Sequence, residues 1–211
     1  MNCRKEDLLL YAVTDRSWLS GHTLYEQVEE ALQGGVTMVQ LREKKLTERE
    51  FLKEAVKMKE LCARYHVPLI INDRVDIALM ADADGVHIGQ KDLDLCIARA
   101  MLGPDKIIGV SARTVQQAKL ACEQGADYLG VGAVFPTGTK QDAEVISYER
   151  LKEVCEAASI PAVAIGGITK NNLNGLIGSG ISGIAVVSAV FAQQDIRSAA
   201  NALREQLTKL F

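Results

Sequence analysis

The chain has 211 residues, of which 48% are apolar and 24% are charged, so it can bury one substantial core and is expected to form a single domain over residues 1–211. Its formal net charge is −3 and it has no basic run, which argues against a protein that wraps nucleic acid or lies on an anionic membrane by charge alone. A small molecule is therefore the expected partner.

The location expected from the sequence is the cytoplasm. The apolar run Leu8 to Val13 is too short for the core of a signal peptide. The five cysteines are widely spaced and form no CxxC pair, which argues against a disulfide framework or a zinc site. Residues 175–194 carry no charge, but they contain four glycines, three serines and two glutamines. This composition predicts a loop, a strand and another loop rather than a membrane span.

Short apolar or β-branched runs recur along the whole chain and predict buried strands. In chain order these runs occupy residues 8–15, 37–43, 69–73, 85–88, 107–111, 128–132, 161–167 and 183–190. Helical patterns lie between them. Residues 47–65 are expected to form one helix with a capping box of Thr47 and Glu50, and Thr114 with Gln117 gives the same start signal for a helix around 115–124.

Strands that alternate with helices imply parallel pairing with crossover helices, and eight such units favour an α/β fold closed into a (β/α)8 TIM barrel. An open, doubly wound sheet is the structural alternative. No GxGxxG sequence follows the first predicted strand, so the dinucleotide-binding fingerprint of that alternative is missing.

Polar residues and glycines gather just past the predicted strands, where a barrel places its active site. In chain order they are Gln40, Arg42, Glu43 and Lys44, then Asn72 and Asp73, Gln90 and Asp92, Ser111, Thr137, Gly138, Thr139 and Lys140, Gly166 and Gly167, and Ser188. Seven of the eight strand ends carry such residues, so the sequence predicts one polar mouth.

Several of these residues also have a purely structural interpretation. Arg42 and Lys44 are compatible with a solvated strand end. Asp73 by itself is better interpreted as the cap of the next helix, and Asp92 is well placed to cap a helix that begins near position 93. His87 is expected to be a hydrogen-bonded packing residue rather than a base.

The combination is more specific than its parts. Asp73 and Asp92 on adjacent loops would face the cations Arg42, Lys44 and Lys140. Two carboxylates can hold a hard divalent ion such as Mg²⁺, which takes further ligands from water and substrate phosphates, and the cations can neutralise the other phosphate oxygens. This pattern predicts a site for a diphosphate that leaves during the reaction, since a metal and cations stabilise the charge that builds on it. No covalent enzyme intermediate is indicated.

Seven sequence segments resemble the thiamine phosphate synthase family, in the same order along nearly the whole chain. They are QLREK (40–44), INDRVDIAL (71–79), ADGVHIGQKDL (83–93), IGVSA (108–112), ADYLGVGAVFPTGTK (126–140), AIGGI (164–168) and AVVSAV (185–190). The resemblance implies a TIM-barrel transferase of thiamine biosynthesis that uses Mg²⁺. Such an enzyme joins 4-amino-2-methyl-5-(diphosphomethyl)pyrimidine to 4-methyl-5-(2-phosphoethyl)thiazole, or to its carboxylated form, and releases diphosphate.

The resemblance also implies residue roles. The pyrimidine diphosphate would be bound by Gln40, Leu41, Arg42, Glu43, Lys44, Asn72, Ser111 and Lys140, among which Arg42, Lys44, Ser111 and Lys140 would be catalytic. Asp73 and Asp92 would bind Mg²⁺. The thiazole phosphate would be bound by Thr137, Gly138, Thr139, Gly167, Val187 and Ser188. The segment AEVIS (143–147) departs from the family, which often has proline or glycine there.

Two other functions compete with this one. A thiazole tautomerase-like isomerase of the same barrel family would keep mainly the half of the site that binds thiazole phosphate. Such an isomerase should not retain both metal-binding acids and the QLREK cations, all of which are present here. A non-catalytic phosphate-binding barrel is the other alternative, and only an assay separates it from the transferase.

Overall fold

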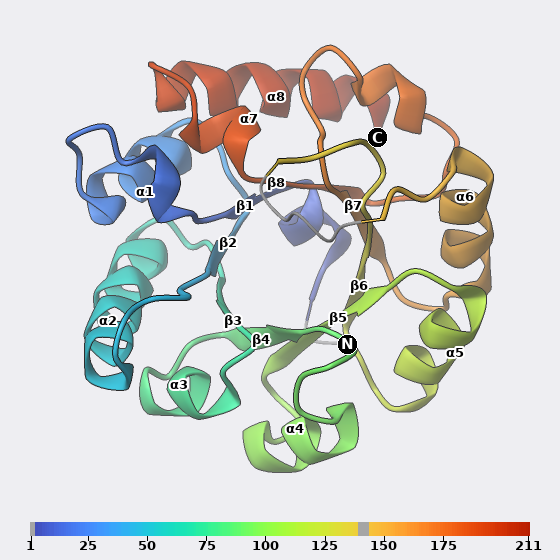
Figure 1. Ribbon diagram of the computed structural model, residues 1–211, viewed down its shortest axis with the longest axis horizontal. Coiled ribbons are helices and arrows are strands. Elements are labelled where there is room, and N and C mark those ends of the chain that lie inside the picture. The colour runs from blue at the N-terminus through green and yellow to red at the C-terminus, as the bar shows by residue number, and fades with distance from the viewer. Residues whose placement is uncertain (1–2, 139–143) are drawn as a thin grey trace.

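The computed structural model describes residues 3–138 and 144–211, and its eight parallel strands close into a barrel in the order β1 to β8. Figure 1 shows the strands in the middle of the molecule, with helices around the outside. The strands are β1 (Leu10–Val13), β2 (Met38–Leu41), β3 (Leu69–Asn72), β4 (Gly85–Ile88), β5 (Ile107–Ala112), β6 (Tyr128–Gly132), β7 (Ala162–Ile165) and β8 (Gly183–Val186). Each strand pairs with the next in sequence, and β8 closes on β1 with Leu10 opposite Ile184. The predicted TIM barrel is confirmed.

The helices connect successive strands. The α-helices are α1 (Leu24–Gln33), α2 (Glu48–Arg64), α3 (Val75–Met80), α4 (Leu95–Leu102), α5 (Val115–Glu123), α6 (Tyr148–Ala157), α7 (Ser188–Phe191) and α8 (Ile196–Leu210). The described residues also form three short 3₁₀ helices, η1 (Lys5–Leu8), η2 (Arg16–Trp18) and η3 (Leu173–Leu176). The crossover from β7 to β8 is made through η3, whereas α7 and α8 both follow β8.

Side-chain caps explain where several helices begin. The hydroxyl of Thr47 accepts from Glu50 N while the Glu50 carboxylate accepts from Thr47 N, so the predicted capping box of α2 is confirmed. In α5, Thr114 accepts from Gln117 N, but the Gln117 side chain accepts from Arg113 N at 2.7 Å. In α6, Ser147 accepts from Arg150 N, so the last residue of the unusual AEVIS segment is a helix cap.

The core has two layers, one between the strands and the helices and one inside the barrel. The inner layer contains Tyr11, Met38, Ile70, Tyr128 and Val163, which come from five different strands. Cys3 and Leu8 also belong to it, and η1 precedes β1, so this N-terminal segment closes the barrel at the amino ends of the strands. A deep cavity is therefore expected at the carboxyl ends of the strands.

The structure corrects the prediction that one strand extends over residues 183–190. Strand β8 ends at Val186, and α7 begins at Ser188. Val187 has φ −115° and ψ −82°, and its carbonyl accepts from the amides of Val190 and Phe191, so the chain turns away from the sheet there. The strand expected within residues 175–194 is confirmed, but α7 replaces part of the loop predicted after it. In the described ranges, no helix is long and apolar enough to cross a bilayer.

Candidate active site

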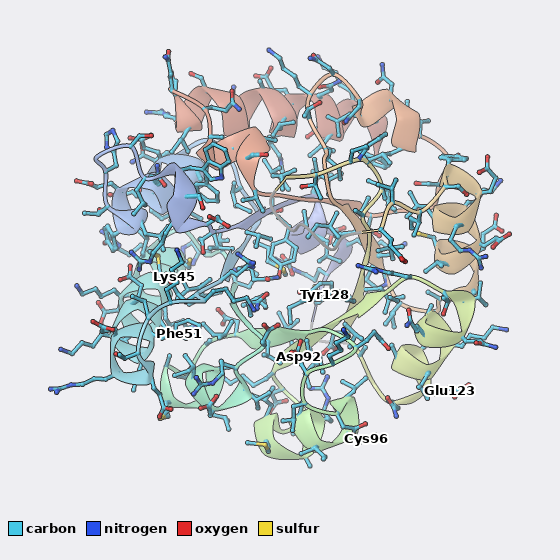
Figure 2. The ribbon with its side chains drawn as sticks, in the orientation of Figure 1. Lys45, Phe51, Asp92, Cys96, Glu123 and Tyr128 are labelled. Atoms are coloured by element: carbon cyan, nitrogen blue, oxygen red, sulfur yellow. The ribbon has the colours of Figure 1, made fainter. Side chains whose placement is uncertain are left out.

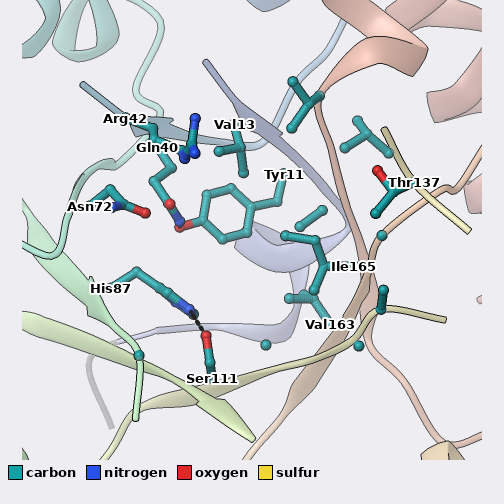
Figure 3. A pocket seen from close by; sticks show the side chains of 18 of the residues that line it. Tyr11, Val13, Gln40, Arg42, Asn72, His87, Ser111, Thr137, Val163 and Ile165 are labelled. Atoms are coloured by element: carbon teal, nitrogen blue, oxygen red, sulfur yellow. Dashed lines mark hydrogen bonds between the residues drawn. The ribbon is translucent and has the colours of Figure 1, made fainter. Parts of the chain in front are cut away.

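A cavity of about 590 Å³ opens at the carboxyl ends of the strands and has lining residues from all eight strands or the loops after them. Figure 3 shows its interior, where Tyr11, Gln40, Asn72, His87 and Ser111 converge from five neighbouring parts of the barrel wall. A volume of this size is typical of a small-molecule site. The mouth predicted from the strand ends is therefore present as one cavity.

The QLREK segment contributes alternate side chains to the cavity. Its lining residues are Gln40, Arg42 and Lys44. Leu41 is fully buried in the outer core layer, and the carboxylate of Glu43 accepts from Arg16 Nε at 2.7 Å. Burial raises the pKa of Glu43. The predicted ligands Leu41 and Glu43 thus have side chains directed away from the cavity, because side chains alternate along an extended chain.

Arg42 is held in place by the end of β1. Its backbone N–H donates to the hydroxyl of Thr14 at 2.9 Å, and Thr14 is completely buried. Its guanidinium Nη1 donates to Asp15 Oδ2 at 3.1 Å. Asp15 was not among the predicted site residues, although its position just past β1 is the signal that selected the others.

The two acids predicted to bind metal lie together at the mouth. Lys44 Nζ donates to Asp73 Oδ2 at 2.6 Å, and Asp92 Oδ2 accepts from Gly89 N at 2.7 Å. Burial raises the pKa of Asp92, and the nearby Asp73 carboxylate raises it further. Two carboxylates that disfavour each other's charge are an arrangement that a bound cation would stabilise.

Neither acid caps a helix, which corrects the structural interpretation of both. Helix α3 begins after Arg74 without a side-chain cap, and Asp73 has a left-handed backbone with φ 62°. Helix α4 is capped by Asp94, which accepts from the amides of Cys96 and Ile97. Asp73 and Asp92 are therefore free of the structural role that their neighbours in sequence suggested.

The donors at the mouth fit a magnesium ion. Carboxylate oxygens are hard ligands, and Mg²⁺ in proteins is commonly held by one or two carboxylates together with waters and substrate phosphates. Over the part of the chain that the structure describes, no group of three or more His, Cys, Asp or Glu side chains could hold a metal ion. The pair Asp73 and Asp92 matches the small protein ligand set that Mg²⁺ requires.

Ser111 and His87 form part of the polar cavity wall. His87 Nε2 and Ser111 Oγ share a hydrogen bond of 2.9 Å, drawn as a dashed line in Figure 3. His87 Nδ1 shares another of 3.0 Å with Tyr128 Oη, and Gln90 Nε2 donates to the backbone carbonyl of Ser111 at 2.7 Å. Both ring nitrogens of His87 are thus hydrogen-bonded, as expected, and the ring also lines the cavity.

The strand ends β6 to β8 form the other half of the mouth. The predicted residues that line the cavity here are Thr137, Gly167, Val187 and Ser188. Gly167 has φ +63°, and a Cβ atom there would collide with the carbonyl oxygen of Pro136. Glycine is therefore required where the β6 and β7 loops meet. A Cβ on Gly138 would point into open space, and the predicted residues Thr139 and Lys140 lie outside the described residues.

Two further cations, Lys91 and Arg113, line the cavity and were not predicted. They follow β4 and β5 closely, so their positions just past these strands could have identified them. With Arg42 and Lys44 they give, among the described residues, four lining cations against the two carboxylates of Asp73 and Asp92. This excess of positive charge suits a ligand with several phosphate oxygens.

Comparison with known proteins agrees with this geometry. The family model described as thiamine monophosphate synthase matches residues 10–190. The thiamine-phosphate synthase of Clostridium tetani is 51% identical over 100% of this chain and 99% of its own, and that of Ruminiclostridium cellulolyticum is 52% identical over 95% and 96%. A solved structure of thiamine phosphate pyrophosphorylase from Pyrococcus furiosus superposes with a TM-score of 0.91 at 40% identity, covering 98% of each chain.

The match begins at the first residue of β1 and ends inside α7, so it spans all eight strands and the loops that form the cavity. Sequence, fold and cavity therefore lead to one conclusion. The chain belongs to the thiamine monophosphate synthase family.

Proposed function

We propose that the chain is a transferase of thiamine biosynthesis that forms thiamine phosphate. It would join 4-amino-2-methyl-5-(diphosphomethyl)pyrimidine to 4-methyl-5-(2-phosphoethyl)thiazole and release diphosphate, or join it to the carboxylated form of the thiazole and release both diphosphate and CO₂. The observation that carries this proposal is the acid pair Asp73 and Asp92 beside Lys44 and Arg42 at the mouth of the cavity. A leaving diphosphate needs acids that hold a metal ion and cations that neutralise its other oxygens, both at the same position.

Asp73 and Asp92 would hold Mg²⁺ in this enzyme. The bound ion would supply positive charge that neutralises the diphosphate oxygens. Lys44 Nζ lies 2.6 Å from Asp73 Oδ2, so this cation would stand beside the diphosphate as well as the ion.

The chain's own cations would stabilise the departing group. Arg42, Lys44 and Lys140 would face the position where negative charge builds as the bond to the methylene carbon breaks, so their contribution would be largest in the transition state. Gln40, Asn72 and Ser111 would orient the pyrimidine ring. This ring is an electron-rich aminopyrimidine, so it tolerates positive charge at that carbon. The ring nitrogen of the thiazole then attacks, and it has no proton to lose, so no general base is needed.

The β6–β8 half of the mouth would bind the thiazole phosphate. The groups assigned to it are Thr137, Gly138, Thr139, Gly167, Val187 and Ser188. Gly167 supports this assignment because its lack of a side chain lets backbone N–H groups approach a phosphate closely. Holding the two substrates at adjacent halves of one mouth supplies the orientation on which the reaction depends.

The test is formation of thiamine phosphate from the two precursors, with diphosphate measured as the second product. EDTA should abolish both products and added Mg²⁺ should restore them. An undiminished rate without any divalent metal would refute the role given to Asp73 and Asp92. Conversion of the thiazole phosphate alone, with no diphosphate released, would instead identify the isomerase alternative.

The cytoplasm is the compartment that we propose for this enzyme. All five cysteines are free thiols in the structure, and Cys96 is exposed. Exposed thiols persist in a reducing compartment. Fractionation of cells that produce the protein would test this, and recovery in an oxidising compartment would contradict it.

A further inference from the structure

An unbroken chain of hydrogen bonds crosses the inside of the barrel from Gln40 to Ser111. Gln40 Nε2 donates to Tyr11 Oη at 2.6 Å, and Tyr11 Oη lies 2.8 Å from Tyr128 Oη. Tyr128 Oη lies 3.0 Å from His87 Nδ1, and His87 Nε2 lies 2.9 Å from Ser111 Oγ. The five residues come from the five strands β2, β1, β6, β4 and β5. Both ends of the chain line the cavity.

Two glycines make room for this chain. A Cβ atom on Gly109 would overlap the ring of Tyr128, and one on Gly130 would lie 3.0 Å from His87 Cε1. The rings also contact one another, with Tyr11 and Tyr128 edge to face at 5.9 Å between centroids. Figure 2 shows Tyr128 inside the ring of helices, in contrast to Cys96 and Glu123 at the outside. The barrel wall is thus shaped around the central residues of the chain.

Both phenols keep their protons. Tyr11 is 1% exposed and Tyr128 is 0% exposed, and burial raises the pKa of each hydroxyl above its ordinary value. A neutral phenol donates one hydrogen bond and accepts others. A hydroxyl that accepts a hydrogen bond from one neighbour therefore donates its own proton to the next.

The direction of every bond follows from the first one. Tyr11 accepts from Gln40 Nε2, so its own proton goes to Tyr128. The Tyr128 proton then goes to Nδ1 of His87, which must be unprotonated, and the imidazole carries its proton on Nε2 and donates it to Ser111 Oγ. Ser111 accepts within the chain, so its own proton is available to the cavity.

The charge of the cavity favours this direction over the reverse. When Nε2 of Gln40 faces Tyr11, the carbonyl oxygen is the remaining polar atom of the amide. The lining contains Arg42, Lys44, Lys91 and Arg113, and an oxygen is a better neighbour for cations than an amide NH₂ group. In the reverse direction the NH₂ group of Gln40 would face these cations, and Ser111 would donate its proton to Nε2 of His87.

We propose that Tyr11, Tyr128 and His87 are positioning residues that set the hydrogen-bonding polarity of Gln40 and Ser111, and thereby select a 4-aminopyrimidine over a 4-oxopyrimidine. The inference rests on the proposed function for its substrate. The carbonyl of Gln40 accepts from the exocyclic amino group, and the hydroxyl of Ser111 donates to N3, the ring nitrogen next to the carbon that carries this amino group. A 4-oxopyrimidine presents the opposite pattern, an acceptor oxygen beside an N–H donor. It would leave two polar pairs mismatched.

The first test determines the tautomer of His87 in the intact protein by ¹⁵N NMR of labelled histidine, with the His87→Asn variant used to assign its signals. We expect a neutral ring protonated at Nε2. A ring protonated at Nδ1 would overturn the proposal. This measurement needs neither substrate nor activity, so its result is independent of the proposed reaction.

The second test compares kcat/KM for the 4-amino and 4-oxo pyrimidine diphosphates. The wild type should prefer the 4-amino compound, and Tyr128→Phe should reduce that preference about tenfold, because His87 then loses the donor that fixes its tautomer. Tyr11→Phe should act in the same direction. Tyr65→Phe removes a phenol at the end of α2 and should leave the preference unchanged.

An unchanged preference in both Tyr128→Phe and Tyr11→Phe would overturn the proposal. Loss of activity on both compounds in equal proportion would do so as well, since it would indicate a structural role alone. If the wild type forms no product from either pyrimidine, the proposed function fails, and the tautomer of His87 still decides in which direction the hydrogen bonds run from Gln40 to Ser111.

Discussion

At the scale of single residues, the site depends on which neighbours each charged group has. Asp92 and Asp94 are separated by one residue, yet the first accepts from the Gly89 amide at the mouth and the second caps α4. Lys44 and Lys45 are adjacent, yet only the first of these two lines the cavity. Two residues of the same type can therefore have different roles although they are neighbours in the sequence.

Asp92→Asn should raise the Mg²⁺ concentration needed for half-maximal rate by at least about tenfold, because the proposed metal site loses one of its two charged ligands. Its free energy of unfolding should change by less than about 1 kcal/mol, the size of a cap effect. Titration of the initial rate with Mg²⁺, together with thermal denaturation, checks both expectations. Asp94→Asn is the matched control: asparagine caps as well as aspartate, so both quantities should stay close to wild type.

Lys44→Ala should lower kcat by about tenfold or more, since it removes a cation that would face charge developing on the diphosphate. Lys45→Ala should leave kcat within about twofold, because that side chain is exposed outside the cavity. Steady-state kinetics with both substrates varied gives the comparison. An increase in KM for the thiazole phosphate alone, at wild-type kcat, would contradict the assignment of Lys44 to the diphosphate.

At the scale of the elements, caps and close contacts decide where each helix begins and how the loops meet. Thr114 caps α5, the helix that follows the strand carrying Ser111. The Gln117 side chain ties Arg113 to the same turn, and both residues line the cavity. The start of α5 is therefore also part of the cavity wall.

Thr114→Ala should lower the free energy of unfolding by about 1 kcal/mol, because one N–H group in the first turn of α5 loses its acceptor. Denaturant unfolding followed by circular dichroism measures this loss. Thr114→Ser keeps a hydroxyl at the cap and should differ from wild type by only a few tenths of a kcal/mol. Equal losses in the two variants would show that the methyl group of Thr114, rather than the cap, stabilises this turn.

At the scale of the whole molecule, the two ends of the barrel have different tasks. At the amino ends of β5 and β6, Asp127 Oδ2 accepts from Arg99 Nη2 at 2.6 Å and from Ile108 N at 2.9 Å. Arg99 also donates to the carbonyls of Gly103 and Lys106. In this ion pair Asp127 is buried and Arg99 is partly exposed. It joins two strands and α4 far along the barrel from the cavity, so it serves stability.

Arg99→Ala should lower the free energy of unfolding by about 3 kcal/mol, because it leaves the buried Asp127 carboxylate without its cation. The KM values of the folded enzyme should remain unchanged, which kinetics below the unfolding transition would check. The exposed pair Lys152 and Glu156 provides the control, and Lys152→Ala should change stability by less than about 0.5 kcal/mol. Altered KM values in Arg99→Ala would show that the two ends of the barrel are coupled.

Local patterns in the sequence were sufficient to predict the fold and much of the candidate site. Eight apolar runs separated by helical patterns identified the barrel, since each run must be buried on both faces and each crossover is right-handed. Gln40, Asp73, Asp92 and Ser111 were predicted to share one mouth because they lie at or just past strand ends, and all four line the cavity. These features depend on neighbours in sequence, which is why they can be read from it.

Only the tertiary structure decided the features that depend on contacts across the barrel. The sequence could not say which side chains of QLREK enter the cavity, because a shift of one residue exchanges the two faces of a strand. It suggested helix caps for Asp73 and Asp92, because the groups that these carboxylates contact in the fold cannot be recognised from the sequence. Asp73 accepts from Lys44, which follows another strand, and Asp92 accepts from Gly89 N because of the shape of its own loop. The chain from Gln40 to Ser111 joins strands up to 117 residues apart in sequence. Its direction is set by protons shared between those strands, and no local pattern encodes that arrangement.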